Sequence, residues 1–230
     1  MSPIRRTLLL TASGLLVLAA VASLAPGAVA RTLKPGTLRA RWPIKTSEPA
    51  NGPSHPKDVK LADLLALGDI PGVAAQDPNF QSKRIPTPVN GLHEGDIIRT
   101  KGWVHVIAMD DDGDYHLQVS DSPTSGNHCF IVELPMDKAA FEKDASLRAL
   151  SAKLRPFLRD TLLHDVNRQP SAGGNWMKGQ AYMSITGQLF FDDWHVGGAA
   201  RGVSPNGHVG KAATLWEIHP VTDIRFTKKP

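Results

Sequence analysis

Hydrophobic and polar residues alternate along much of the chain after residue 95, and this pattern predicts five β-strands with one long helical stretch between the third and the fourth. Three strands, a helix and two further strands are the element order of an OB-type barrel. The predicted fold is therefore mainly β: a five-stranded OB-like Greek-key barrel with an α-helical insertion between strands 3 and 4, preceded by a Pro-rich arm. The strands are expected at 96–109, 115–120, 128–134, 180–191 and 214–226.

Glycine and proline inside these strands predict where the sheet is irregular. Gly102 lies within the first strand and Gly187 within the fourth, so each is expected at a bulge or bend. Pro220 removes a hydrogen-bond donor from the last strand, which indicates a strand edge or a bulge beside His219.

After Pro135 the hydrophobic period changes from two to about 3.6, which predicts a helix that plugs one end of the barrel. Pro156 interrupts helical hydrogen bonding, so a kink, or two helices meeting near Arg155, is expected. The opposite face is basic and is expected to be solvated, with contact to an acidic partner as the alternative. The apolar face comprises Phe141, Leu147, Leu150, Leu154, Phe157, Leu158 and Leu162, and the basic face Lys143, Arg148, Lys153, Arg155 and Arg159.

Residues 31–95 form a Pro-rich arm, because prolines spread through it exclude any long regular element. One short helix is expected at about 58–67, packed on the barrel. Its residues Leu64 and Leu65 could instead form a docking face for a partner. The predicted division of the chain is a signal peptide at 1–30, the arm at 31–95 and the barrel domain at 96–230.

The first thirty residues have the pattern of a secretory signal. Arg5 and Arg6 precede an apolar run at 8–24, and Ala28 and Ala30 form a small-x-small cleavage site before Arg31. A retained anchor and twin-arginine export are the alternatives. The mature protein is therefore expected in the periplasm or outside the cell, without a stable membrane anchor.

Charge and cysteine content limit the possible partners and stabilising bonds. Loss of residues 1–30, whose only charged side chains are Arg5 and Arg6, lowers the formal charge from +4 to +2. A nearly balanced chain does not favour nucleic-acid binding. The single cysteine, Cys129, cannot form an internal disulfide and lies in an apolar run, so a buried, inert thiol is expected.

An acidic turn between the first two strands has the Asp spacing of a calcium loop. Asp110, Asp112 and Asp114 alternate as in an EF-hand, but Gly113 falls one place early and no Glu stands at the bidentate position. A solvated hairpin turn is therefore favoured. Because the chain also has no phosphate-binding loop, zinc-ribbon spacing or nucleophile elbow, nucleotide hydrolysis and serine-type acyl transfer are disfavoured.

Three carboxylate and imidazole pairs lie near strand ends, where residues two apart on a strand share a face. If they converge, they could hold zinc or another divalent ion, with His116, His195 and His219 as the candidate ligands. The favoured interpretation is that they form hydrogen bonds that hold the barrel mouth shut, and a ligand-binding rim is the third possibility. The pairs are Asp114 and His116, Asp192 and His195, and Glu217 and His219.

Five blocks of sequence are spread over most of the mature chain: Arg41-Trp42-Pro43-Ile44-Lys45-Thr46, Asp112-Gly113-Asp114-Tyr115-His116-Leu117, Ile131-Val132-Glu133-Leu134-Pro135, 187–195 (GQLFFDDWH) and Glu217-Ile218-His219-Pro220-Val221. As a set they resemble a family of exported bacterial proteins of unassigned activity. The chain departs from that pattern by a longer loop between His195 and Thr214. The resemblance implies a secreted OB-like domain and supplies no catalytic residue. More distantly, the layout is similar to small periplasmic OB-fold proteins, which implies a binding role.

Aromatic residues could supply stacking platforms for single strands or sugars, although rings in a small barrel more often belong to the core. The expected function is an exported binding or structural domain, without a cofactor, for a small molecule, an oligosaccharide or a protein. The alternative is a metal-dependent hydrolase that uses a divalent ion at the barrel mouth. The aromatic residues considered are Trp103, Tyr115, Trp176, Phe191, Trp194 and Trp216.

Overall fold

The computed structural model describes residues 41–47, 55–138, 144–198, 201–205 and 210–230, which all belong to one compact unit, Leu33–Pro230. The predicted signal segment and the helix positions Phe141 and Lys143 lie outside the described residues. Within the described ranges, no helix has both the length and the hydrophobicity needed to cross a membrane.

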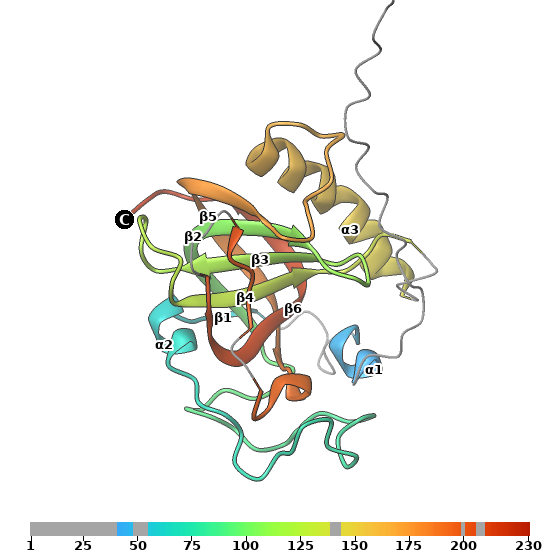
Figure 1. Cartoon of the computed structure of the whole chain (residues 1–230). Helices are drawn as coiled ribbons and strands as arrows, with labels where there is room; N and C mark the ends of the chain where they lie inside the picture. Colours follow the sequence, from blue (N-terminus) through green and yellow to red (C-terminus); the bar gives the residue numbers. More distant parts are fainter. Residues whose placement is uncertain (1–40, 48–54, 139–143, 199–200, 206–209) are drawn as a thin grey trace, which may run out of the picture. The chain divides into compact units, whose positions relative to one another are not determined.

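Five strands close into a barrel, as predicted (Figure 1). Neighbouring strands follow the order β2-β3-β4-β6-β5, and pairing of β5 with β2 completes the circle. The β4–β6 pair is parallel and the other barrel pairs are antiparallel. The barrel strands are β2 (Ile97–Met109), β3 (Tyr115–Ser120), β4 (Cys129–Leu134), β5 (Asn175–Phe191) and β6 (Ala212–Phe226). β5 begins five residues before the predicted start, because Asn175 and Trp176 already pair with β2.

The register of the strands shifts at several places, two of which were predicted. β5 shifts against β6 on both sides of Gly187, and His219 and Pro220 of β6 together lie opposite one residue of β5, Gln188. β4 also shifts against β6, between Cys129 and Ile131. The bulge predicted at Gly102 lies instead at His105, between Val104 and Val106. Gly102 is a point of close packing: a Cβ there would lie 2.5 Å from both Leu61 Cδ2 and Val119 Cγ1.

The predicted helical insertion forms α3 (Ala145–Leu158), which continues into a π-helical turn, η1 (Arg159–Leu163). Asp144 caps its first turn by accepting a hydrogen bond from Leu147 N. Pro156 lies inside α3, and the change of helix type follows three residues later. α3 lies against the barrel (Figure 1). Of the described apolar positions, Leu147 is buried but outside the core cluster, and the others belong to the core or pack against it: Leu150, Leu154, Phe157, Leu158 and Leu162.

Arg155 contradicts the prediction of a solvated basic face. Only 2% of Arg155 is exposed, and its guanidinium lies 3.6 Å from the centre of the Tyr115 ring. Its Nη atoms donate to the carbonyls of Pro135 and Gly113. The helical period assigned Arg155 to the polar side, but the long side chain reaches around the helix to carbonyls at the end of β4 and in the β2–β3 turn.

The described part of the arm packs on the barrel. α2 (Leu61–Leu65) corresponds to the predicted short helix, and β1 (Lys57–Asp58) before it pairs in parallel with β2. Leu64 and Leu65 are buried in the core, so they do not form the alternative docking face.

Cys129 is also buried as predicted, and burial raises the pKa of its thiol to about 12.

The shortest helix, α1 (Trp42–Lys45), is fixed to the barrel by Arg41 in front of it. The Arg41 guanidinium donates to both carboxylate oxygens of Glu94, at 2.5 and 2.7 Å, and to the carbonyl of Phe191 at 2.9 Å. The same Glu94 carboxylate accepts the backbone N–H groups of Ile85 and Phe191. This buried pair places the side chains of α1 against β6.

Candidate functional site

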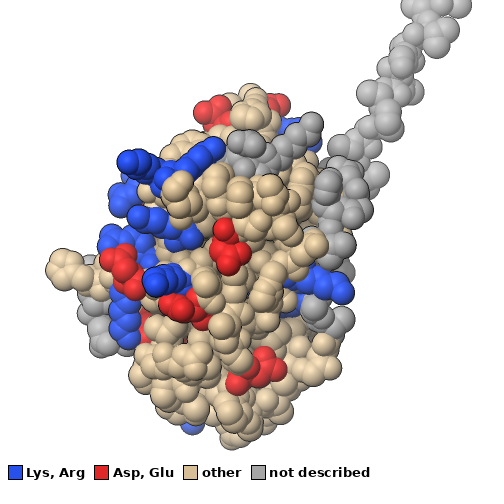
Figure 2. All heavy atoms as spheres, turned by 90° about the vertical axis from the view of Figure 1, so that its left-hand side faces the viewer, with Lys and Arg blue, Asp and Glu red and all other residues tan. Residues whose placement is uncertain are grey.

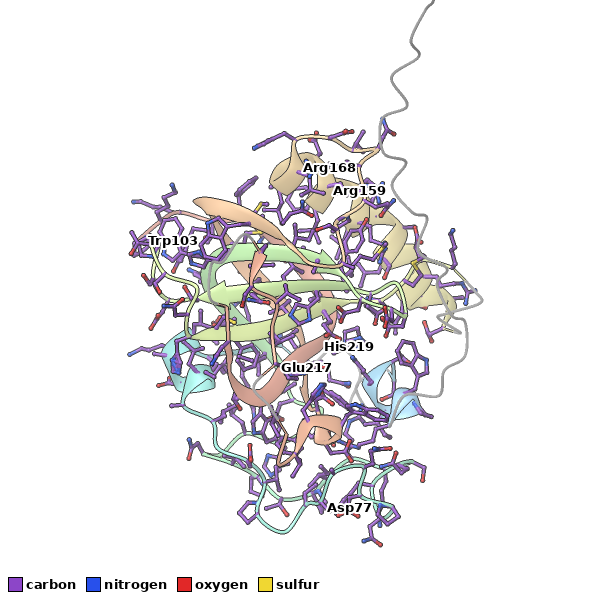
Figure 3. All side chains as sticks on the ribbon, in the orientation of Figure 1. Asp77, Trp103, Arg159, Arg168, Glu217 and His219 are labelled. Atoms are coloured by element: carbon purple, nitrogen blue, oxygen red, sulfur yellow. The ribbon has the colours of Figure 1, made fainter. Side chains whose placement is uncertain are left out.

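The predicted site residues on β3 and β6 lie together inside the molecule. Asp114, Glu217 and His219 are fully buried, and His116 is 6% exposed. Figure 3 shows Glu217 and His219 where β6 meets the α1 segment. Three of these four residues, Asp114, His116 and His219, lie close to Glu133, the only charged side chain of β4.

The two histidines of this cluster have defined partners. His219 Nε2 lies 3.2 Å from Asp114 Oδ2, and its Nδ1 lies 2.8 Å from the carbonyl oxygen of Lys45. His116 Nδ1 lies 3.2 Å from Glu133 Oε1 and 3.5 Å from Asp110 Oδ2. Both rings are therefore held by groups inside the fold.

Lys45 provides the central positive charge. Its Nζ lies 2.5 Å from Glu133 Oε2 and 3.4 Å from Glu217 Oε1. Burial alone would lower the pKa of Lys45, but the charges of Glu133 and Glu217 outweigh it and raise the pKa well above its usual value. Lys45, a residue of the arm, therefore places its ammonium group between the buried carboxylates of Glu133 and Glu217.

Asp192 and His195 occupy the outer end of the same network. Arg201 Nη1 lies 2.5 Å from Glu217 Oε2 and 2.6 Å from Asp192 Oδ2. His195 Nδ1 lies 2.7 Å from Asp192 Oδ2, and the His195 side chain is 40% exposed. His195 is therefore connected to the other histidines only through a chain of ion pairs, and the three candidate metal ligands do not converge on one point.

Three further groups of the network, His116, Asp192 and Glu133, have shifted pKa values that keep them charged near neutral pH. Burial opposes protonation of His116, but hydrogen bonds to Asp110 and Glu133 raise its pKa to about 9. Burial would raise the pKa of Asp192, but its hydrogen bond with His195 and the charge of Arg201 lower it to about 2. For Glu133, burial is outweighed by Lys45 and by the two histidines, and its pKa lies well below the usual range.

Two groups within the described ranges have the donor types of a metal site. Asp110, His116 and Glu133, and likewise Asp114, Glu133 and His219, bring their ligand atoms within 4.8 Å of one another. A divalent ion in either group would meet the Lys45 ammonium beside Glu133, and in the first group it would have to displace a proton from His116. The ligand atoms are of a suitable type, but the Lys45 ammonium and the proton on His116 already compensate the carboxylate charges. These residues therefore fit a divalent cation poorly.

The acidic turn is a hairpin, as predicted, but only part of it is solvated: Asp111 is exposed and Asp110 partly exposed, whereas Asp112 and Asp114 are buried. Asp114 N donates to Asp112 Oδ1, and Asp114 Oδ1 accepts from Met136 N. Asp112 is 8% exposed and Asp114 is fully buried. Met136 and the Arg155 side chain cover the turn, which explains why its exposure was predicted incorrectly.

Sequence reasoning did not assign roles to Lys45, Glu133 and Arg201, which complete the network. Glu133 carries a usable signal, because an isolated carboxylate in the apolar strand Cys129–Leu134 indicates a buried charged partner. Lys45 lies in one of the sequence blocks noted above, but its partner Glu133 is 88 residues away. Arg201 lies in a loop without regular pattern.

A separate open groove of about 790 Å³ lies where β1, α2, β2, β5 and the end of β6 meet. Arg99 pairs with Asp58 at 2.7 Å. Lys60 and Lys101 are exposed, and within the described part of the chain no carboxylate lies within 4 Å of either ammonium group, although the charge of Lys101 helps to lower the pKa of Asp58. Figure 2 views the side of Figure 1 near α2 and the C-terminus, and shows Lys and Arg gathered along part of that face with Asp and Glu among them. The lining includes Asp58, Lys60, Arg99, Thr100, Lys101, Asp121, Tyr182, Ser184 and Arg225.

No match was found to a family model, to a curated protein or to a solved structure. The family resemblance of the five sequence blocks stays a prediction. The function of this chain is therefore argued from the geometry of the buried network and of the groove.

Proposed function

We propose that this protein is an exported, non-catalytic binding domain whose ligand occupies the groove between β1, α2, β2, β5 and the end of β6. The observation that carries the proposal is the presence of two exposed lysines, Lys60 and Lys101, in a groove of about 790 Å³, without a carboxylate partner among the described residues. The volume falls in the usual range for ligand pockets, roughly 300–1,000 Å³.

The state of the buried network supports a structural role for the predicted site residues. A general base needs a pKa near the working pH and access to the substrate. His116 has a pKa of about 9, which keeps it protonated near neutral pH. Both ring nitrogens of His219 face internal partners, and the residue is fully buried.

Export belongs to the proposal and rests on the sequence of the first thirty residues. The small residues Ala28 and Ala30 flank Val29 as signal peptidase requires. Mass spectrometry of the protein recovered from outside the cytoplasm should give an N-terminus at Arg31. A full-length chain that fractionates with membranes would contradict this part of the proposal.

A ligand screen by thermal shift tests the binding function. A ligand of the groove should raise the melting temperature of the exported protein, because binding to the folded state alone stabilises it. The shift should disappear in the double variant Lys60→Ala/Lys101→Ala and persist in Lys153→Ala, a matched exposed lysine on α3. Ligands whose shifts survive the double variant would overturn the assignment of the groove.

The metal-dependent hydrolase is the second candidate, and one observation favours it. Asp110, His116 and Glu133 place three ligand-type atoms within 4.8 Å, and Asp110 is partly exposed. Metal analysis of protein purified without a His-tag discriminates between the two candidates. A stoichiometric divalent ion that is lost in His116→Gln would favour the hydrolase.

A further inference from the structure

We infer that the groove takes a linear acidic oligosaccharide, a chain of sugar rings with separated carboxylate groups. The inference deepens the proposed binding function and rests on it. Three properties of the lining carry it: the small number of available cations, the presence of acceptor carboxylates, and an aromatic ring on one wall.

The positive charge available to a ligand is small and divided between two positions. Arg99 is held by Asp58 at 2.7 Å, and Arg225 lies 3.6 Å from Asp223. Lys60, which precedes α2, and Lys101, in β2, are exposed and have no carboxylate within 4 Å among the described residues, although the charge of Lys101 contributes to lowering the pKa of Asp58. Two separate ammonium groups suit a ligand with isolated carboxylates better than a chain with one phosphate per unit, which requires many cations along its path.

The groove also presents carboxylates, which accept hydrogen bonds. Asp58 and Asp121 line it together with the lysines. A hydrogen bond from Arg99 lowers the pKa of Asp58, which keeps this carboxylate ionised. Ionised carboxylates repel every anionic group of a ligand, and they disfavour a phosphodiester chain most because each of its units is charged, but they accept hydrogen bonds from the hydroxyl groups of a sugar. A ligand that carries both hydroxyl donors and carboxylates matches this mixture of charges.

One wall of the groove offers an aromatic ring. Tyr182 of β5 is half-buried and packs on Trp103, with 5.0 Å between ring centres. Aromatic rings present an apolar body beside a polar handle, which suits the apolar face of a pyranose. Figure 3 shows Trp103 well separated from His219, so this wall is distinct from the buried network.

Isothermal titration of the exported protein, in the presence of EDTA, tests the inference. The probes are oligomers of galacturonate, of alginate and of hyaluronan, each beside its carboxyl-reduced neutral counterpart. A single-stranded oligodeoxynucleotide and inorganic polyphosphate serve as polyanion controls. We expect at least one acidic oligosaccharide to bind at least tenfold more tightly than its neutral counterpart and than either polyanion.

Variants connect that binding to the groove. Lys101→Ala and Tyr182→Ala should each weaken binding at least tenfold, whereas Lys153→Ala should bind like the wild type. A different result is that the polyanions or the neutral sugars bind more tightly than the acidic oligosaccharides and lose affinity in Lys101→Ala. That result would contradict the inference of an acidic oligosaccharide, while the groove would still be the binding site. If no probe binds in a way that depends on Lys101 or Tyr182, the inference is wrong. If the thermal shifts produced by ligands from the screen are also unchanged in these variants, the proposed function is wrong as well.

Discussion

The buried network and the open groove contain the same kinds of side chain but differ in what their charges face. In the network, Lys45 and Arg201 lie 2.5–3.4 Å from carboxylate side chains that are at most 14% exposed. In the groove, Lys60 and Lys101 are exposed. A cluster of ionisable residues therefore does not by itself indicate a working site. Charges without an internal partner are the ones available to a ligand.

Removal of Lys45, the central cation of the network, should lower the free energy of unfolding more than any other change considered. Lys45→Met leaves Glu133 and Glu217 buried with less compensation, and breaking a buried ion pair typically costs about 3–5 kcal/mol. The control is Lys57→Met, because the Lys57 side chain is 53% exposed and pairs with Asp96 near the surface. Urea denaturation should show a change of at most about 1 kcal/mol for the control.

A further variant sharpens this test. Lys45→Met combined with Glu133→Gln removes one of the uncompensated carboxylates, so it should be more stable than Lys45→Met alone. Equal losses for Lys45→Met and Lys57→Met would show that Lys45 is not the centre of the network.

Loss of His219 should have the next largest effect and should not depend on metal. His219→Ala removes buried hydrogen bonds to Lys45 O and Asp114 Oδ2, which should cost about 1–3 kcal/mol. Melting temperatures with and without EDTA should agree for the wild type, while the variant melts lower in both buffers. A drop in the wild type on chelation that matches the variant would favour the metal-dependent hydrolase.

Deprotonation of His116 should weaken the network less, because Glu133 keeps its pairing with Lys45. The folded-state pKa of about 9 lies above the ordinary 6.5 because Asp110 and Glu133 hold the protonated ring. The stabilisation is therefore fully present below about pH 6.5 and is lost as the pH rises through about 9. Melting temperatures measured across this range should decline in the wild type and be flatter in His116→Gln. Parallel curves for the two proteins would contradict the assignment.

The groove lysines should have the smallest effect on stability. Lys60→Ala and Lys101→Ala remove exposed side chains without a described carboxylate partner, so the free energy of unfolding should change by no more than about 0.5 kcal/mol. The matched control is again Lys153→Ala on α3. A loss as large as that of Lys45→Met would place these lysines in a structural role and remove the contrast between the two regions.

The sequence alone was sufficient to predict the barrel and the order of its elements along the chain. Alternation of apolar and polar residues reports which face of a strand is buried, and the strands predicted in this way overlap all five barrel strands, whereas the short β1 was not predicted. Gly187 and Pro220 also marked their bulge correctly, because glycine and proline act on the local backbone. The buried face of α3 followed from its helical period for the same reason.

Only the tertiary structure determined how the charged side chains are paired. Lys45 meets Glu133 because the Arg41–Glu94 pair fixes α1 to the barrel, and no local period relates these positions. Arg155 left the predicted polar face because carbonyls of Gly113 and Pro135 lie within its reach. The groove likewise combines residues from β1, α2, β2, β5 and the segment after β6. Periodicity encodes burial within one element, whereas the partner of a charge depends on how separate elements pack.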